Sequence, residues 1–175
     1  MGKNETQGSV IQVGAIMEKI TFTLSVHSIR YEGASTRLIE LRPPAGTYLP
    51  PVEAGAHIDV HCGEGIIRQY SLCGDPNDRR NLMIAVNHGN PSRGGSELMH
   101  KKVKEGDNLE IGSPRNNFLL DETQAHTILI AGGIGITPFL SLSKDLQQDI
   151  RFLIEGRTAK TLNVDQLLLD IIDQN

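Results

Sequence analysis

The 175-residue sequence has little cysteine: only Cys62 and Cys73. A plant-type [2Fe–2S] cluster needs four cysteine thiolates, so this chain carries no iron–sulfur cluster of its own. Two cysteines also provide no disulfide framework, and they favour a reducing, cytoplasmic setting in which both are core or near-core residues. The histidines show no metal-ligand spacing, and we expect no metal. His57, Asp59 and His61 alternate on one strand but form only a weak ligand set.

The chain also lacks an excess of positive charge and a long apolar run. Its formal net charge is −4 at pH 7, so no nucleic-acid partner is expected. The longest uncharged apolar stretch, residues 127–140, is too short and too interrupted by glycine and proline to span a membrane. Residues 1–17 lack the basic and apolar regions of a signal peptide. We therefore expect a soluble cytoplasmic protein with a loose polar leader at 1–17.

Short alternating segments dominate the first two thirds of the chain. Residues 20–26 alternate apolar and polar side chains, and similar runs follow at 37–41, 57–62, 68–72, 81–86 and 108–111. Turns rich in glycine, proline and aspartate separate them. This pattern predicts an all-β sandwich or barrel. One helix interrupts it, with Ser96 expected as its N-cap and Lys101, Lys102 and Lys104 near its C-terminal end.

The pattern changes near residue 125. Thr127–Ala131 is continuously apolar, which predicts a strand buried on both faces of a parallel sheet. A glycine turn follows, and then a helix with Thr137 at its cap and Pro138 at its first position. A strand over 150–154 and a helix from Asn163 give the order β-α-β-α, the start of a doubly wound domain. Two parallel strands do not make a finished sheet, so this α/β lobe is predicted to be incomplete.

Three motifs carry the chemistry, and the first is Arg68-Gln-Tyr-Ser71. The period of a strand puts Arg68 and Tyr70 on one face and Ser71 on the other face or at the edge. Arginine offers a planar charged fork for phosphate. Tyrosine offers a flat face for a ring or a hydroxyl for a sugar-like chain. Taken alone, this pattern is more often a plain surface strand.

The second motif is the turn Ser92-Arg-Gly-Gly-Ser96. Its glycines, Gly94 and Gly95, let the backbone approach a ligand, and successive N–H groups can surround an anion. The turn leads directly into a helix, whose first N–H groups are unpaired. The alternative is a surface turn with an ordinary helix cap. Following Arg68-Gln-Tyr-Ser71, the turn favours a phosphate site.

The third motif, Gly132-Gly-Ile-Gly-Ile-Thr-Pro138, lies where a strand becomes a helix. It is not a Walker A loop, because no Gly-Lys-Ser/Thr follows. It also departs from the Rossmann fingerprint, because Pro138 occupies the last glycine position. Gly132, Gly133 and Gly135 permit close approach, and the helix N-terminus at Thr137 would face an anionic phosphate.

In this order the three motifs resemble those of the ferredoxin-NADP reductase superfamily. They are most similar to the FMN-containing reductase components of Rieske-type aromatic oxygenases, the phthalate dioxygenase and vanillate demethylase reductase group. The resemblance runs from about Ile20 to Leu142. It implies a Greek-key FMN-binding β-barrel over 18–122 and an incomplete NAD(P)H-binding α/β domain over 123–175. It implies a reductase that passes electrons from NADH or NADPH through FMN to a separate [2Fe–2S] ferredoxin or Rieske oxygenase component.

The resemblance also implies roles for single residues. In this family the serine corresponding to Ser71 hydrogen-bonds near flavin N5, and the segment that contains Thr137 lies under the nicotinamide and pyrophosphate, so the resemblance implies that Ser71 and Thr137 are catalytic. FAD fits less well than FMN, because its pyrophosphate would need a more extended binding segment and its adenine a partner, and the sequence shows neither. The implied FMN-binding residues are Arg68, Gln69, Tyr70, Ser71, Ala85, Val86, Ser92, Arg93, Gly94, Gly95 and Ser96. Those implied for the dinucleotide are Gly132, Gly133, Ile134, Gly135, Thr137 and Pro138.

The tail departs from this family. A late Cys-Gly-Pro segment and a [2Fe–2S] domain, both present in the family, have no counterpart here. Gly156-Arg-Thr158 resembles the loop that meets the adenine ribose. Alternatively, residues 162–169 resemble a later segment, which implies an internal deletion, and the short helix after Pro138 favours this second interpretation. A non-catalytic flavin-binding or structural remnant is therefore the alternative function. A third is an FAD-using relative that serves a separate ferredoxin.

Overall fold

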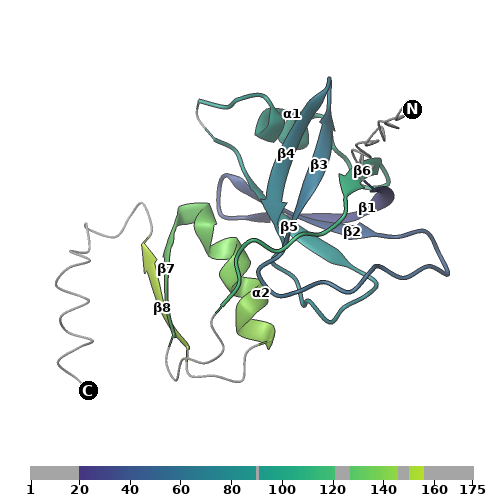
Figure 1. Ribbon diagram of the computed structural model, residues 1–175. Coiled ribbons are helices and arrows are strands. Elements are labelled where there is room, and N and C mark those ends of the chain that lie inside the picture. Colours follow the sequence, from purple (N-terminus) through teal and green to yellow (C-terminus); the bar gives the residue numbers. More distant parts are fainter. Residues whose placement is uncertain (1–19, 90, 121–126, 146–149, 156–175) are drawn as a thin grey trace, which may run out of the picture.

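The structure is a computed structural model that describes residues 20–89, 91–120, 127–145 and 150–155. The first part contains a six-stranded sheet. Figure 1 shows α1 at one end of this part, and a smaller part made of β7, β8 and α2. The predicted β-barrel followed by a partial α/β lobe is confirmed. The elements are β1 (Thr21–Glu32), β2 (Thr36–Arg42), β3 (His57–Gly63), β4 (Ile66–Ser71), β5 (Leu82–Asn87), α1 (Gly95–Lys101), β6 (Asn108–Gly112), β7 (Thr127–Gly132), η1 (Gly133–Ile136), α2 (Thr137–Asp145) and β8 (Ile150–Glu155).

Several predicted features lie outside the described residues. They are the leader at 1–17, the helix from Asn163, and both interpretations of the tail beyond residue 155. Within the described residues, no helix is long and apolar enough to cross a membrane.

The six strands of the first part form one antiparallel sheet in the order β4-β3-β6-β1-β2-β5. An isolated bridge between Leu72 and Ile84 joins the two edge strands and closes the sheet into a barrel. Alternate side chains point inward, as the sequence pattern predicts. Fully buried residues from five strands meet in the interior: Leu24, Ile39, Ile58, Ile84 and Ile111.

Helix α1 covers one end of the barrel, with Leu98 and Met99 buried in the core. Its N-cap is Gly94 and not Ser96, so that prediction is wrong. The backbone of Gly94 has φ +89°, a left-handed conformation that glycine adopts far more readily than serine. Ser96 is instead the second residue of the helix. The helix ends at Lys101, with Lys102 as its C-cap, so Lys104 lies beyond the helix.

Arg37 fixes the other end of α1 to the barrel. Its side chain is 7% exposed. Nη1 donates hydrogen bonds to the carbonyl oxygens of Met99 (2.6 Å) and His100 (2.9 Å), and Nη2 donates to Val103 (3.2 Å). The cation thus lies where the last carbonyls of a helix lack intrahelical donors.

We expect Arg37→Met to lower the free energy of unfolding by about 2–4 kcal/mol, because it leaves buried carbonyls without their charged donor. Methionine keeps much of the volume, so the loss reports the hydrogen bonds. Urea unfolding measures it. Arg30→Met, at an exposed position on β1, is the control, with an expected change within about 0.5 kcal/mol. Equal effects of the two substitutions would contradict this role.

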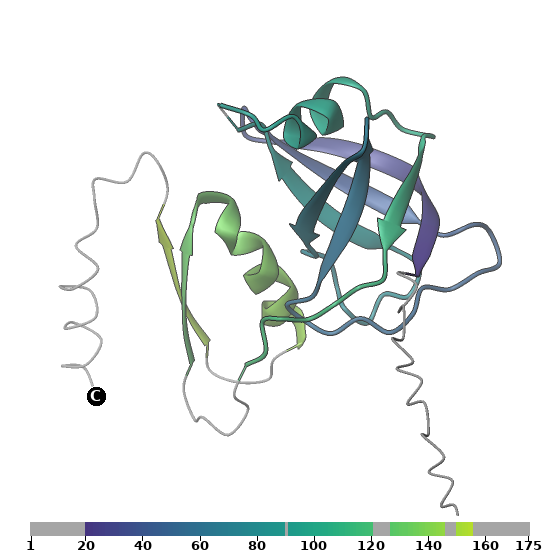
Figure 2. The same cartoon turned by 45° about the horizontal axis from the view of Figure 1, so that its top comes forward.

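The smaller part is a β-α-β unit. Strands β7 and β8 pair in parallel, from Thr127 with Ile150 to Gly132 with Glu155. Figures 1 and 2 show α2 between these strands and the barrel. Leu129 and Phe139 pack with Ala54 of the barrel in a second buried cluster. The parallel pairing confirms the predicted β-α-β order.

Two predictions about this unit are wrong. The first strand is not buried on both faces: Leu129 and Ala131 are 4% and 2% exposed, whereas Ile128 and Ile130 are 40% and 49% exposed. In the described part of the chain, α2 and the barrel cover one face of the strand. Nor is Thr137 the N-cap of α2, because it is the first residue of that helix. It already has helical φ −56° and ψ −47°, and its hydroxyl donates to the Ile134 carbonyl (3.0 Å) because η1 precedes α2 without a break.

Candidate functional site

The first two sequence motifs are in direct contact. Arg68 on β4 donates from Nη2 to the backbone carbonyl of Arg93 (2.6 Å), 25 residues further along the chain. A second guanidinium nitrogen, Nη1, donates to the carbonyl of Ile67 (2.8 Å). These bonds use part of the five-donor fork and leave its position fixed beside the turn. The expected convergence of Arg68 and the glycine turn is therefore present.

Two glycines allow the turn to approach Arg68 closely. A Cβ atom added to Gly95 would lie 2.4 Å from Arg68 Cγ, closer than real Cβ atoms approach, and 3.0 Å from Nε, which is also a tight contact. At Gly94 an added Cβ would lie 3.0 Å from Ile66 Cδ1. The turn thus packs against the stem of Arg68 through its two glycines. This arrangement holds the guanidinium against the backbone of the turn.

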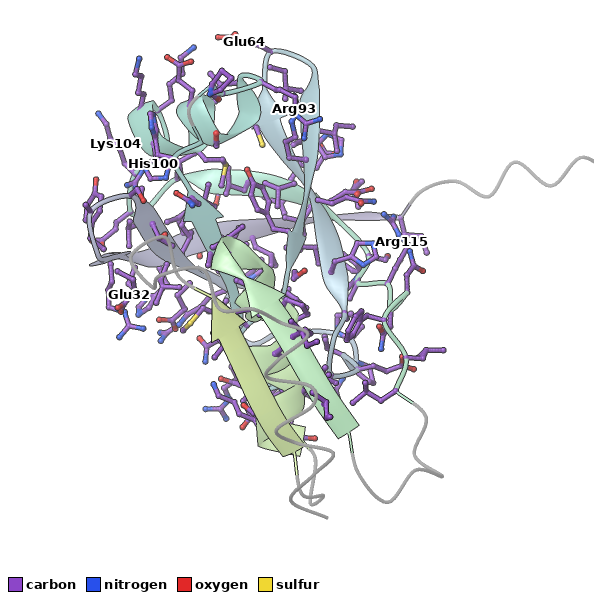
Figure 3. The ribbon with its side chains drawn as sticks, turned by 90° about the vertical axis from the view of Figure 1, so that its left-hand side faces the viewer. Glu32, Glu64, Arg93, His100, Lys104 and Arg115 are labelled. Atoms are coloured by element: carbon purple, nitrogen blue, oxygen red, sulfur yellow. The ribbon has the colours of Figure 1, made fainter. Side chains whose placement is uncertain are left out.

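The polar groups of the turn face one another. Ser92 Oγ lies 3.0 Å from Ser96 Oγ and accepts a hydrogen bond from the Gly94 N–H (3.1 Å). The first N–H donor bonded within α1 is that of Leu98, to Gly94. The backbone N–H groups of Gly95 and Ser96 precede it and have no acceptor within the helix. Two hydroxyls, two N–H groups and the Arg68 guanidinium make a donor set suited to a phosphate monoester. Figure 3 shows Arg93 on this turn beside α1.

Ser71 belongs to the opposite face of β4. The bridge between Leu72 and Ile84 sets the alignment of β4 with β5, and one residue before it Ser71 aligns with Ala85. Ala85 in turn pairs with Leu38 of β2. Paired residues carry their side chains on the same face of a sheet. Ser71, Ala85 and Leu38 therefore form a row on the outward face, whereas Tyr70 packs partly against the core.

That outward row borders a cleft between the two parts of the molecule. The cleft has a volume of about 410 Å³, which lies within the range of small-molecule sites. Leu38, Ala85 and Asn87 line it from the barrel. Gly133, Ile134 and Thr137 of the third motif line it from η1 and α2. The cleft thus brings Ala85 and three of the predicted dinucleotide residues together. Gly132, Gly135 and Pro138 lie in the same turn but are not among its lining residues.

The remaining predicted residues have other surroundings. Gln69 points outward and is exposed. Val86 is fully buried, and its carbonyl accepts a hydrogen bond from His100 Nε2 (2.8 Å).

Burial and the neighbouring Cys62 raise the pKa of Tyr70, so its hydroxyl stays protonated and can donate. Burial raises the pKa of Cys62 and brings that of Cys73 to about 11. Both thiols are therefore inert core groups, as predicted.

Sequence reasoning gave no role to a polar group on β3. Arg115 Nη2 forms an ion pair with Asp59 Oδ1 (2.9 Å), and the Asp59 side chain is 4% exposed. The backbones of Arg115 and His57 exchange two hydrogen bonds, 2.8 and 2.9 Å. Among the described residues no three His, Cys, Asp or Glu side chains are placed to bind a metal. The alternation of His57, Asp59 and His61 was visible in the sequence, but the ion-pair partner of Asp59 was not.

The pH dependence of stability follows from two histidines. Burial and Arg115 lower the pKa of His57, and burial lowers that of His100, each from an ordinary 6.5. Below about pH 6.5 the unfolded chain binds more protons than the folded one, so the free energy of unfolding falls as the pH falls. We expect lower urea midpoints at about pH 5.5 than at about pH 7.5. His100→Gln removes one of the two groups and should flatten this dependence. An unchanged slope would contradict the contribution of His100.

Several known proteins are similar to this chain in sequence. The chain is 43% identical over 125 residues to phenoxybenzoate dioxygenase subunit beta of Ectopseudomonas oleovorans, covering 71% of this chain and 39% of the relative. It is 42% identical to vanillate O-demethylase oxidoreductase of Acinetobacter baylyi, covering 76% and 42%. It is 46% identical to phthalate dioxygenase reductase of Burkholderia cepacia, covering 63% and 34%. The chain thus spans about two fifths of the length of these relatives. No protein-family model matches it.

Solved structures agree with the sequence relatives. A phthalate dioxygenase reductase, described as a modular structure for electron transfer from pyridine nucleotides to [2Fe–2S], matches with a TM-score of 0.75 and 38% identity. The match covers 78% of this chain and 44% of that one. The flavohaem-like FAD/NAD-binding domain of nitric oxide dioxygenase from Vibrio cholerae matches with a TM-score of 0.69 and 26% identity, covering 87% and 70%. Sequence and fold together place this chain in the ferredoxin-NADP reductase superfamily.

Proposed function

We propose that this chain binds FMN between Arg68, the turn Ser92–Ser96 and β5, and that it accepts electrons from NADH or NADPH. The observation that carries the proposal is the contact between Arg68 and Gly95. Two segments far apart in the sequence meet at a place where any side chain larger than glycine would collide with the stem of Arg68. They combine a guanidinium, two hydroxyls and unpaired N–H groups in a set that fits one phosphate monoester.

The flavin would follow the wall of the barrel from this phosphate site to the cleft. Between β4 and β5 the pairing consists of the single bridge at Leu72 and Ile84. The wall is therefore least continuous between the phosphate site and Ser71. Tyr70 would meet the flavin from the core side of β4, and Ser71 from the cleft side. FMN supplies the step from hydride to single electrons, and this chain holds and orients it.

The dinucleotide would enter the same cleft from the lobe. Gly133 has φ +54°, and a Cβ added to Gly132, Gly133 or Gly135 would meet no atom within 4 Å. The turn is thus open to a ligand and contributes backbone N–H groups. We propose that Thr137 lies under the nicotinamide. We also propose that the electrons pass to a separate iron–sulfur protein of an oxygenase system.

NADH oxidation with ferricyanide as a one-electron acceptor tests this function. We expect turnover that depends on added FMN and that falls sharply in Gly133→Val, whose side chain would enter the cleft at a left-handed backbone position. Val52→Ala, in the barrel and outside the cleft lining, is the control for general damage to the fold. Flavin binding without any turnover would favour the non-catalytic remnant.

A further inference from the structure

β3 places His57 directly beside Ser71. The two residues are partners in the β3–β4 register. In the next pair, the Leu72 N–H bonds the Ala56 carbonyl (2.9 Å). Antiparallel pairs alternate between hydrogen-bonded and non-bonded, so His57 and Ser71 form a non-bonded pair, in which side chains come closest. Both side chains point to the outward face.

The row continues toward the cleft. His57 on β3, Ser71 on β4 and Ala85 on β5 lie side by side across three strands, and Ala85 lines the cleft. Ser71 therefore stands between the imidazole of His57 and the cleft. A hydroxyl carries one donor and two lone pairs, so it can hydrogen-bond to groups on both sides at once.

The surroundings of the His57 imidazole favour its neutral form. His57 Nε2 is buried and makes no hydrogen bond with any described residue. The charged groups that face it are Asp59 on its own strand and Arg115 from the segment after β6. Burial comes first and Arg115 second in lowering the pKa of His57, while Asp59 opposes them. Figure 3 shows Arg115 on the segment that leads from the barrel toward the lobe.

We propose that His57 is a positioning residue for Ser71: with flavin in the cleft, Ser71 Oγ turns to donate its proton to His57 Nε2, a hydrogen bond that is not formed in this structure. This inference rests on the proposed function. A proton that reaches Oγ from the cleft displaces the one already on Oγ, which moves to Nε2. The negative charge of Asp59 stabilises the imidazolium that forms, and the positive charge of Arg115 destabilises it, so that the proton is readily returned. No electrons move in this exchange, and the number of protons is conserved.

Two measurements test the pair in the full-length chain. The first is a ¹⁵N-histidine NMR titration without ligand. Asp59→Asn should lower the pKa of His57 and Arg115→Gln should raise it, because each removes one of the two opposing charges. The second is the midpoint potential of bound FMN as a function of pH. Its slope should change at the pKa of His57 in the wild type and should show no such change in His57→Gln or Ser71→Ala.

A double-mutant cycle separates a shared role from two independent ones. His57→Gln and Ser71→Ala should each slow flavin reduction by NADH roughly tenfold, and the double variant should be no slower than either. FMN affinity should stay within about twofold in His57→Gln, because His57 does not contact the flavin, whereas Ser71→Ala also loses a contact with the flavin and should bind FMN more weakly. His61→Gln is the matched control, since it lies on the same face of β3 but pairs with Ile67.

The outcomes are distinguishable. Wild-type protein that binds no FMN overturns the proposed function and this inference together. If the wild-type protein binds and reduces FMN, two results would contradict the His57–Ser71 pair and leave the proposed function intact. One is a His57→Gln variant whose FMN potential depends on pH as in the wild type. The other is a double variant in which the effects of His57→Gln and Ser71→Ala add.

Discussion

Replacing Arg68 with alanine is expected to weaken FMN binding by roughly tenfold to 100-fold. The reason is the loss of charge-assisted hydrogen bonds to the phosphate, each worth about 1.5–3 kcal/mol. Arg68 also donates to the carbonyl of Arg93, so the turn loses one of its anchors. Quenching of flavin fluorescence during titration of the apoprotein measures the dissociation constant.

Riboflavin provides the matched control for this prediction, because it has the isoalloxazine ring and ribityl chain but no phosphate. Wild-type protein should bind it more weakly than FMN, and Arg68→Ala should bind the two with similar affinity. Arg30→Ala, at an exposed position on β1, should leave both affinities unchanged. An Arg68→Ala variant that still prefers FMN as strongly as the wild type would show that another group holds the phosphate.

The second large effect is expected from Gly95→Ala. The added Cβ would lie 2.4 Å from Arg68 Cγ, so the arginine stem or the turn must shift. We expect a loss of about 1–3 kcal/mol in the free energy of unfolding, as for other overpacked sites, together with weaker FMN binding. Backbone strain does not contribute, because Gly95 has an ordinary helical position and alanine is the better helix former.

The clash itself can be tested by removing its other partner. In an Arg68→Ala background the Cγ atom is absent, and Gly95→Ala should then cost little stability. Gly89→Ala is a further control, because an added Cβ there would meet only the Pro91 carbonyl at 3.8 Å. If Gly95→Ala destabilises equally with and without Arg68, the close approach to the arginine is not the cause.

The sequence predicted most of the barrel because the signals there are local. Each strand alternates apolar and polar residues, and the observed bounds differ from the predicted runs mainly at their ends. The contact between Arg68 and the glycine turn was also predictable, since both segments already had residue types suited to phosphate. Their meeting, however, depends on α1 packing over the end of the barrel, which Arg37 secures through long-range hydrogen bonds.

The features that sequence reasoning missed depend on lateral neighbours. No local pattern shows that His57 and Ser71 are partners across β3 and β4. Nor does one show that Arg115 forms an ion pair with Asp59, which lies 56 residues earlier in the chain. The exposure of Ile130 was missed for a similar reason, because a continuous apolar strand does not reveal which of its faces is covered. Both helix caps were predicted wrongly because backbone conformation determines them. Gly94, in a left-handed conformation, precedes α1, and η1 runs directly into α2.

The most direct test of the account is the visible absorption spectrum of the FMN-loaded protein, recorded without oxygen before and after addition of NADH. We predict a bound-flavin band that bleaches on addition of NADH, because the cleft brings the proposed flavin-binding face of the barrel and the glycine turn of the lobe together. Arg68→Ala should retain little of that band after removal of free FMN. A wild-type band that persists after NADH would contradict the proposed electron transfer, and the absence of any bound flavin would contradict the assignment of the site.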